Sequence, residues 1–463
     1  MIPLDRFDDT HHEYFIITII INTSGFRKTG GGGCGLFLSD RLAARLAARN
    51  IHYGWVVVAA TFLTSITAAG AVGAPGVLMI PLQKEFGWTA SEISTALAIR
   101  MVLFGLMGPF AAALINRFGV RRMALTSLSI IGGGMLLSLG MNSLWELILL
   151  WGVVVGLGTG MTALVLGATI ATRWFTARRG LVIGLLTASS ATGQLVFIPM
   201  TAWLAEEIGW RTALSVICAM LAVAATGVLL LMRDRPGDIG LRAYGEAPGA
   251  PEPAPPPPAG SVAFAAIDTL RMAAKTRVFW VLFATFFVCG ASTNGLIQTH
   301  LVPMCVDFGM PAVKAAGMLA VIGIFDFIGT VASGWLSDRY DNRWLLFWYY
   351  GLRGLSLLYL PYSDFTFYGL SLFAVFYGLD WVATVPPTVK LTVERFGREK
   401  ANLVFGWVFA GHQLGAACAA FGGGFSRTYL ESYMPAFYVA GVLCLFAALI
   451  CPSMGRKASP VAA

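Results

Sequence analysis

Charged residues are scarce in this sequence. Asp, Glu, Lys and Arg make up 12% of its 463 residues, whereas hydrophobic residues make up 57%, and the mean hydropathy is +0.72. Soluble globular domains carry about 25% charged residues, so this composition excludes a soluble fold. The net charge of +8 is then expected in the loops between apolar segments and not on a nucleic-acid-binding surface.

Motifs for catalysis and metal binding are also missing. The sequence has no H-E-x-x-H, no P-loop and no G-x-S-x-G elbow, which argues against an enzyme. Its seven cysteines lie mostly inside apolar runs and form no C-x-x-C pair. This usage argues against a disulfide framework or a metal site, and for small packing residues. We expect no catalytic residue, no metal and no cofactor.

Long apolar runs fill most of the sequence. From Gly54 onward there are twelve, each of about 19–28 residues, and about 20 residues suffice to cross the hydrocarbon core of a bilayer. The predicted spans are 54–80, 93–115, 121–140, 145–171, 180–203, 212–232, 278–303, 313–336, 343–361, 365–389, 401–424 and 433–451.

A linker separates the first six spans from the last six. Its centre, Ala247–Gly260, is rich in proline, which predicts an extended polar segment and not a packed element. The expected organisation is a tail at 1–53, a six-helix bundle at 54–232, a linker at 233–275, a second six-helix bundle at 276–451 and a tail at 452–463.

The N-terminal tail is predicted to be dispensable for the fold. Ile16–Ile21 is apolar but too short to span a bilayer, and Gly30–Gly33 is a flexible run. Leu38–Asn50 has the pattern of a short basic amphipathic helix lying on the membrane surface. No signal peptide with a cleavage site is recognisable. A start codon upstream of the native one would explain this tail equally well.

The distribution of Lys and Arg predicts the orientation. Loops after the even-numbered spans carry 18 of these residues, and loops after the odd-numbered spans carry four. Since basic loops stay in the cytoplasm, both tails and the linker are expected there. The expected location is the bacterial inner membrane, the expected partners are the lipid bilayer and a small molecule, and the expected state is a monomer without nucleic acid.

A short charged motif occurs once in each half, and its two copies are separated by close to half the chain. The later copy reads Gly334-Trp-Leu-Ser-Asp338-Arg339-Tyr-Asp-Asn-Arg343, and the earlier copy reads Ala112-Ala-Leu-Ile-Asn116-Arg117-Phe-Gly119-Val-Arg121-Arg122. One helical hairpin closed by a basic turn is therefore duplicated.

The glycine of the later copy is expected to let two helices approach closely. Asp338 is expected to accept hydrogen bonds from a helix N-terminus or to pair with Arg339 or Arg343 when the two halves close. The alternative is that these are ordinary charges flanking a cytoplasmic loop.

This motif resembles the G-x-L-x-D-R-x-x-x-R loop of the major facilitator superfamily. The resemblance implies an all-α membrane protein with twelve transmembrane helices in two six-helix bundles. The earlier copy departs from the motif at Ala112 and Asn116, so a gate in the first half cannot use a carboxylate at position 116. The gate residues that the resemblance implies are Gly334, Asp338, Arg339, Arg343, Arg117, Gly119 and Arg122.

Three shorter motifs resemble the bacterial monocarboxylate-porter and oxalate/formate-antiporter group. They are Tyr53-Gly54-Trp55, Phe86-Gly-Trp-Thr-Ala-Ser91-Glu92-Ile93 and Arg173-Trp-Phe-Thr-Ala-Arg178-Arg179-Gly180. Span 5 lacks the G-P-x-x-G-G pattern of drug/proton antiporters, since Gln194 follows Gly193. Span 4 contains Gly152, Gly156 and Gly160 at intervals of four, which predicts close packing against another helix.

Four ionisable residues are predicted near the bilayer midplane of the second half. At 1.5 Å per residue, Asp326, Arg353, Asp380 and His412 lie about 14–16 Å from the cytoplasmic ends of their spans. An ionisable group within a span is costly and is by default a functional hypothesis. The sequence predicts that these residues share a depth, but not that their side chains converge.

Each of these residues has a structural and a functional interpretation. Asp326 is the best candidate for proton coupling, because removal of a carboxylate from water favours its protonated form. Asp380 is a second candidate. Arg353 is expected to be a structural ion-pair partner of Asp326 or Asp380. His412 either contacts substrate or proton, or forms a hydrogen-bonded packing pair with Gln413.

The substrate candidates in the remaining spans are Arg100, Asn294 and Gln298, the last two one turn apart on span 7. In the resembling porters an arginine that binds the carboxylate follows the span-8 acid by one turn. Here that position is Thr330, so Arg100 is the candidate replacement.

We therefore expect a secondary transporter that takes up a small organic anion, a mono- or dicarboxylate, with protons, and uses the proton gradient as its energy source. Export of an amphiphilic compound by proton antiport is the alternative within transport. A transporter-like membrane sensor is the alternative from another class.

Overall fold

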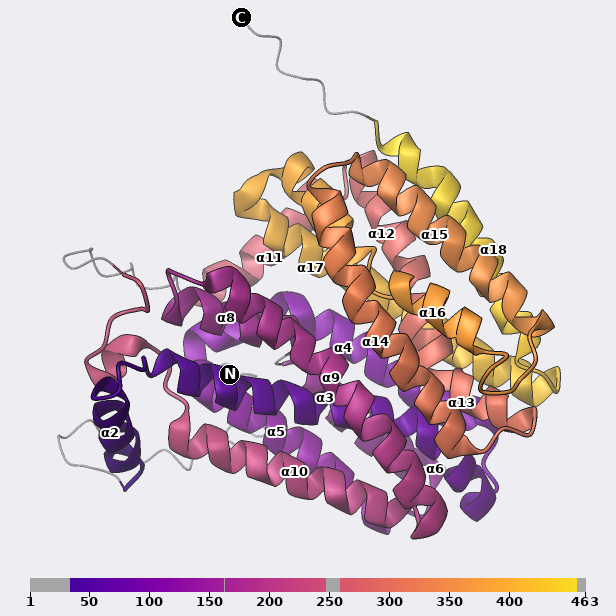
Figure 1. The fold of residues 1–463 in the computed structure, drawn as a ribbon, viewed down its shortest axis with the longest axis horizontal. Coiled ribbons are helices and arrows are strands. Elements are labelled where there is room, and N and C mark those ends of the chain that lie inside the picture. Colours follow the sequence, from indigo (N-terminus) through magenta and orange to yellow (C-terminus); the bar gives the residue numbers. More distant parts are fainter. Residues whose placement is uncertain (1–33, 162, 247–258, 456–463) are drawn as a thin grey trace, which may run out of the picture.

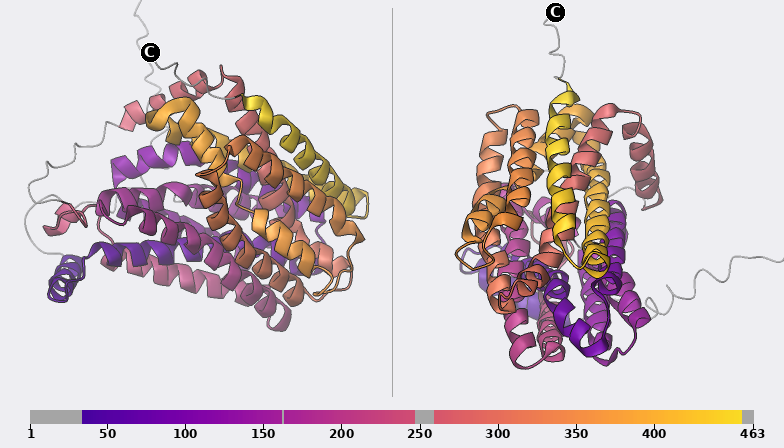
Figure 2. Two further views of the ribbon diagram at one scale, coloured as in Figure 1. Left: turned by 45° about the horizontal axis from the view of Figure 1, so that its top comes forward. Right: turned by 90° about the vertical axis from the view of Figure 1, so that its right-hand side faces the viewer.

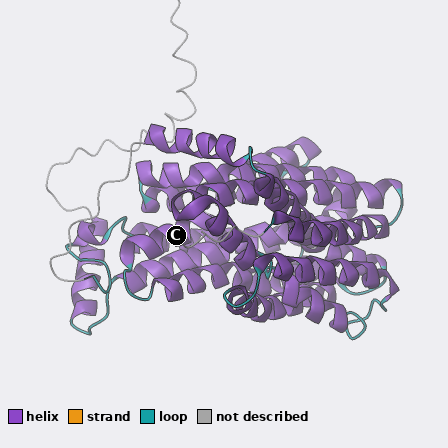
Figure 3. Cartoon of the chain, turned by 90° about the horizontal axis from the view of Figure 1, so that it is seen from above, coloured by secondary structure: helices purple, strands orange, loops and turns teal. Residues whose placement is uncertain are grey.

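The computed structural model describes residues 34–161, 163–246 and 259–455, and almost all of them are helical (Figures 1 and 3). The first half contains α2 (Cys34–Ala47), α3 (Gly54–Phe86), α4 (Ala90–Phe118), α5 (Val120–Leu137), α6 (Leu144–Leu147), the π-helix η2 (Ile148–Val155), α7 (Gly156–Gly160), α8 (Ala163–Trp174), α9 (Arg179–Glu207) and α10 (Trp210–Leu231).

The second half repeats this arrangement after a linker helix. It contains α11 (Ala259–Ala273), α12 (Arg277–Gly290), the π-helix η4 (Ala291–Ile297), α13 (Gln298–Asp307), α14 (Ala312–Ser337), α15 (Asn342–Tyr359), α16 (Ser371–Asp380), α17 (Val385–Tyr429) and α18 (Met434–Ile450). α17 holds two successive spans, because non-helical backbone at Gly397 interrupts it.

These helices form twelve membrane spans. In the described part of the chain, nine helices are long and apolar enough to cross a membrane by length and composition. The other three spans are α6 to α8 with η2, α9, and α15. The protein is thus an all-α, multi-pass membrane protein with two six-helix bundles, as the sequence predicts.

The duplication extends to the positions where helices begin. α4 begins at Ala90 and α14 at Ala312, and the same interval separates the start of α5 from the start of α15. The two halves therefore share the positions at which these helices begin.

The two bundles contact each other along α4 and α17, from Ser91 and Thr428 at one end to Phe110 and Trp407 toward the other, and between α9 and α14 (Figures 1 and 2). Further contacts join the bundles at one end of the molecule. We call this the far end; it carries the short connections after α3, α9, α13 and α17. The opposite end, which we call the linker end, carries α2, α11 and the motif loops. At the far end, Val77 of α3 and Ile198 and Ala202 of α9 are buried in one apolar cluster with residues of the second half.

Glycines set the closest helix contacts. A Cβ atom on Gly152 would lie 3.1 Å from the Ala96 carbonyl oxygen, and one on Gly156 would lie 3.0 Å from Arg100 Cα. Gly160 faces Met107 in the same way. The prediction that these three glycines pack against a neighbouring helix is confirmed, and that helix is α4.

Two features differ from the sequence expectations. The linker is not extended throughout, because α11 begins at Ala259 and packs on both α4 and α17, where the Trp407 indole donates to the Ala266 carbonyl at 2.9 Å. Span 10 begins at Ser371, not 365, after a loop. Most of the proline-rich centre and residues 1–33 lie outside the described residues.

Two glycines of α14 provide a test of the packing. A Cβ atom on Gly329 would meet the Leu379 carbonyl oxygen, whereas one on Gly334 would meet open space. We expect Gly329→Ala to lower the thermal unfolding midpoint of the purified protein, since overpacking costs about 1–3 kcal/mol. Gly334→Ala should hold or raise it, because alanine is favoured over glycine in a helix by about 1 kcal/mol. Equal midpoints for the two variants would contradict this account.

Candidate functional site

The break between α16 and α17 organises the polar residues of the second half. Residues 381–384 are turns and not α-helix, so the peptide groups there need partners from elsewhere in the bundle. The Arg353 guanidinium donates to the carbonyl oxygens of Asp380 at 2.5 Å and Trp381 at 3.0 Å. The Asp326 carboxylate accepts the Val382 N–H at 2.9 Å.

Arg353 also forms a buried ion pair. Its Nε donates to Asp380 Oδ2 at 2.6 Å, and the Arg353 side chain is fully buried. A second guanidinium nitrogen lies 3.0 Å from Cys289 Sγ and 3.4 Å from Ser292 Oγ. Of the two acids that the sequence left open, Asp380 is thus the ion-pair partner, and Arg353 is directed at the helix break.

Asp326 faces the same break from α14. Its Oδ1 accepts the Thr330 hydroxyl at 3.0 Å in addition to the Val382 N–H. Thr330, which occupies the position of the arginine in the resembling porters, is therefore a partner of the acid. Asp326, Arg353 and Asp380 share both a depth and a location, and the break in span 10 is what brings them together.

His412 and Gln413 point to different neighbours. The His412 ring is parallel to Phe409, with 5.6 Å between ring centroids, and lies 4.9 Å from Phe286. A Cβ atom on Gly105 of α4 would lie 2.5 Å from Gln413 Cβ, so Gln413 sits between the two halves. His412 Nδ1 and Gln413 Nε2 are both buried without a hydrogen-bond partner among the described residues. No hydrogen bond between the two side chains is described, so this structure does not support the alternative in which they form a hydrogen-bonded packing pair.

Arg100 is a buried cation without an acidic partner in the described part of the chain. Its side chain is 5% exposed, and its NH1 group donates to the Val72 carbonyl of α3 at 2.9 Å. None of the five ion pairs between described residues includes it. The next residue, Met101, packs with Ala416, Ala417 and Ala420 of α17. Arg100 therefore lies on α4 where that helix meets the second half.

Gln298 approaches the same stretch of α3. Its backbone oxygen lies 2.6 Å from the position of a Cβ on Gly76, one turn after Val72, and its side-chain Nε2 is buried without a described partner. Asn294 lies in η4, where the Thr299 hydroxyl donates to the Asn294 carbonyl at 2.9 Å. Asn294 and Gln298 were expected to lie on one face because residues four apart do so in an α-helix. A π-helix has more residues in each turn, so this spacing does not apply to η4.

In this structure the charged residues of the second-half gate motif form contacts within their own half. Asp338 accepts from Lys390 at 3.0 Å and from neither arginine of its own motif. The Arg343 guanidinium binds Asp341 at 2.6 Å, and that of Arg339 lies over the Trp335 ring at 4.0 Å. A Cβ atom on Gly334 would meet open space, so the expectation that this glycine lets two helices approach closely is wrong.

In the first half, the carboxylate at the motif loop belongs to Asp234, which follows span 6. Asp234 Oδ1 accepts the Arg121 N–H at 2.8 Å and lies against Gly119, whose φ is +87°. Arg117 lies over the Phe118 ring, and Arg122 is exposed. Arg343 occupies the position of the second half that corresponds to Arg121. Its backbone N–H also donates to a carboxylate, that of Asp341.

Sequence reasoning missed three residues of these loops: Lys390, Asp234 and Arg121. The only signals were a charge run at 233–235, directly after span 6, and a lone lysine at the end of span 10. All gate contacts described here lie within one half, and none joins the two bundles.

Two related six-helix bundles, with buried polar groups where they meet, define the class of secondary transporters. The chain belongs to the Major Facilitator Superfamily, whose sequence profile matches residues 61–420. It is a transporter and not an enzyme.

Curated relatives support this assignment over most of the chain. The uncharacterized MFS-type transporter YcxA of Bacillus subtilis is 25% identical, covering 82% of this chain and 90% of its own. Monocarboxylate transporter 13 of Bos taurus is 28% identical, covering 85% and 87%. Monocarboxylate transporter 12-B of Danio rerio is 24% identical, covering 86% of each.

The two acids at the helix break should differ in their effect on stability. Asp380→Asn leaves Arg353 as an unpaired buried charge, a change that costs about 3–5 kcal/mol. Asp326→Asn keeps an oxygen that accepts the Val382 N–H, so its cost should be about 1 kcal/mol. Thermal unfolding of both purified variants checks this order, and an equal or larger loss for Asp326→Asn would contradict it.

Proposed function

We propose that this protein moves a small organic anion, a mono- or dicarboxylate, across the bacterial inner membrane together with protons. It would do so as a monomer, by alternating access of two bundles to a site between them. The proton gradient would supply the energy.

The observation that carries this proposal is the uncompensated charge of Arg100. Arg353 and Arg100 are both buried within membrane spans. Arg353 pairs with Asp380, whereas the partner of Arg100 among the described residues is a neutral carbonyl. Burial removes the water that would stabilise a cation. An anion bound next to the buried cation stabilises it in place of that water. A carboxylate substrate provides that charge.

Two buried amide groups fit the same class of ligand. The buried Nε2 atoms of Gln298 and Gln413 are hydrogen-bond donors without described acceptors, and both residues lie where the halves meet. Carboxylate oxygens would accept from them. The names of two relatives, monocarboxylate transporters 13 and 12-B, support this substrate class at 24–28% identity.

The arrangement of the bundles supports an inward-facing state. Apolar residues join the halves at the far end, and the gate residues at the linker end make contacts within their own half. The linker end carries the basic loops, so we propose that it faces the cytoplasm with both termini.

Asp326 is the proposed proton acceptor. As a carboxylate it holds the Val382 N–H at the break in span 10. Protonation would weaken this hydrogen bond, because a neutral acid is a poorer acceptor than a carboxylate. The protonation state would then be linked to the geometry of span 10.

Uptake into proteoliposomes tests the function directly. Radiolabelled mono- and dicarboxylates would be offered with and without an inward-directed proton gradient, with protein-free vesicles as the control. Gradient-stimulated uptake of at least one compound is expected. Uptake of none of them would contradict the proposal and favour export of an amphiphilic compound.

The coupling role of Asp326 gives a separate prediction. Asp326→Asn keeps a hydrogen-bond acceptor for Val382 but cannot bind and release a proton. We expect it to abolish accumulation against a gradient while substrate exchange across the membrane continues. Counterflow and gradient-driven uptake on the same vesicles measure the two activities, and retained accumulation would remove Asp326 from the coupling mechanism.

A further inference from the structure

Each half of the protein completes the start of a helix in the other half. The first N–H groups of an α-helix have no partner within the helix, so a cap must come from elsewhere. α14 begins after Pro311, which provides no side-chain cap. Its first N–H, that of Ala312, donates instead to Glu206 Oε1 at the end of α9, at 3.0 Å. A first-half carboxylate thus caps a second-half helix.

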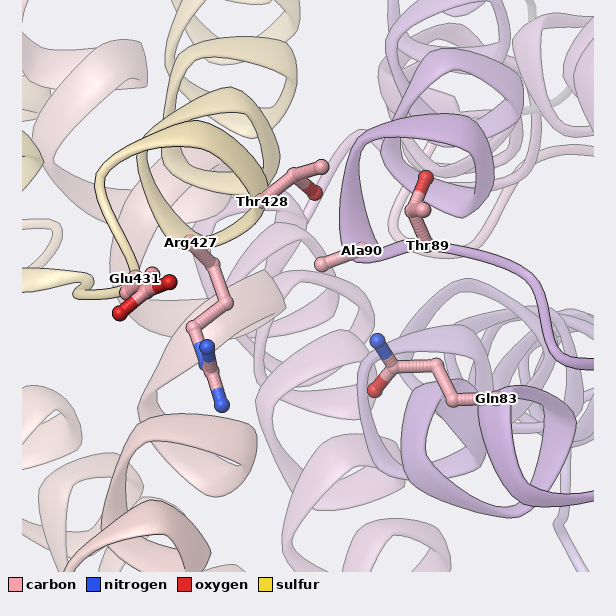
Figure 4. Close-up of a pocket in the computed structure, with 6 residues that line it drawn as sticks. All are labelled: Gln83, Thr89, Ala90, Arg427, Thr428 and Glu431. Carbon is pink, nitrogen blue, oxygen red and sulfur yellow. The ribbon is translucent and has the colours of Figure 1, made fainter.

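The reciprocal contact lies between α17 and α4. Thr89 and Glu92 form a capping box at the start of α4, which leaves the Ser91 N–H unsatisfied within that helix. The Ser91 N–H donates to Thr428 Oγ1 at 3.0 Å. Figure 4 shows Thr428 at the end of α17 beside Thr89 and Ala90 at the start of α4. Here a second-half hydroxyl caps a first-half helix.

The two contacts occupy equivalent places in the repeat. The interval from Glu206 to Thr428 equals the interval from Ala90 to Ala312, the first residues of α4 and α14. The donors are Ala312 and Ser91, so the register differs by one position. The same construction has thus been kept in both halves with different side chains, a carboxylate in one and a hydroxyl in the other.

Both hydrogen bonds lie at the end where the bundles are closed. The contact between Gly76 of α3 and the Gln298 backbone also joins the two halves and brings α3 and α13 together. Separation of the bundles at the far end would break both hydrogen bonds and return the two N–H groups to water.

We propose that Glu206–Ala312 and Thr428–Ser91 form a paired latch that stabilises the closed far end. This proposal rests on the alternating access described above, but not on the identity of the substrate. Since a hydrogen bond that competes with water contributes modestly, loss of one partner should raise the open fraction of the far end about two- to ten-fold. Loss of both should raise it further.

Hydrogen–deuterium exchange of the full-length protein in nanodiscs, without substrate, tests the latch. The loss variants are Glu206→Ala and Thr428→Val. Their matched controls, Glu206→Gln and Thr428→Ser, each retain an oxygen that can accept the hydrogen bond. Peptides covering 74–79 and 296–302 report on the far-end contact, and peptides covering 90–93 and 312–315 report on the capped N–H groups.

We expect faster exchange in both regions for each loss variant, and exchange like that of wild type for each control. Unchanged exchange in both loss variants, or an equal rise in the Gln and Ser controls, would overturn the proposal. Thr428→Val is nearly isosteric, so its result stands even where Glu206→Ala affects folding. Failure to find a transported carboxylate would leave this outcome unaffected, and failure of the latch would leave the uptake result unaffected.

Discussion

A charge buried in a membrane protein must be matched by another charge or by aligned dipoles, and this constraint explains most of the polar architecture. Arg353 satisfies it inside the second bundle, with Asp380 as its counter-ion and two backbone carbonyls as further acceptors. The unsatisfied N–H of Val382 goes to Asp326. The break in span 10 and the three charged residues thus pair with one another, although Asp380 Oδ1 has no hydrogen-bond partner among the described residues. Among the described residues Arg100 has no such arrangement, and for this reason we propose it as the residue that binds a charged substrate.

The two halves share a fold, but equivalent positions in them carry different residues. α4 and α14 begin at corresponding positions of the repeat, as do α5 and α15. In the first half, the glycine face of span 4 packs on α4 beside Arg100. In the second half, the break in span 10 is contacted by Asp326 and Arg353.

Much of the fold follows from the sequence, because apolar runs and basic loops are set by the bilayer itself. The twelve spans and the glycine face of span 4 could be predicted in this way. The common depth of Asp326, Arg353 and Asp380 followed from residue counting. Their convergence did not, because depth along a helix does not fix its rotation, and the break that joins them leaves no periodic signal.

Partner choice in the loops was less predictable. Long side chains such as Lys390 reach across several ångströms, so the nearest charge in sequence is not the nearest in space. Asp338 therefore binds Lys390 and not Arg339 or Arg343. In the first half the carboxylate comes from Asp234, far from Arg121 along the chain. α11 was missed because the preceding proline run dominated the composition of the linker.

Binding of carboxylates to wild type and to Arg100→Gln is the most direct test of the central claim. A ligand at about 100 times its Kd should stabilise the wild-type protein by about 2.7 kcal/mol, seen as a rise in its thermal unfolding midpoint. The account predicts that a carboxylate which stabilises wild type fails to stabilise Arg100→Gln and partly stabilises Arg100→Lys. Equal stabilisation of wild type and Arg100→Gln would show that the anion binds elsewhere.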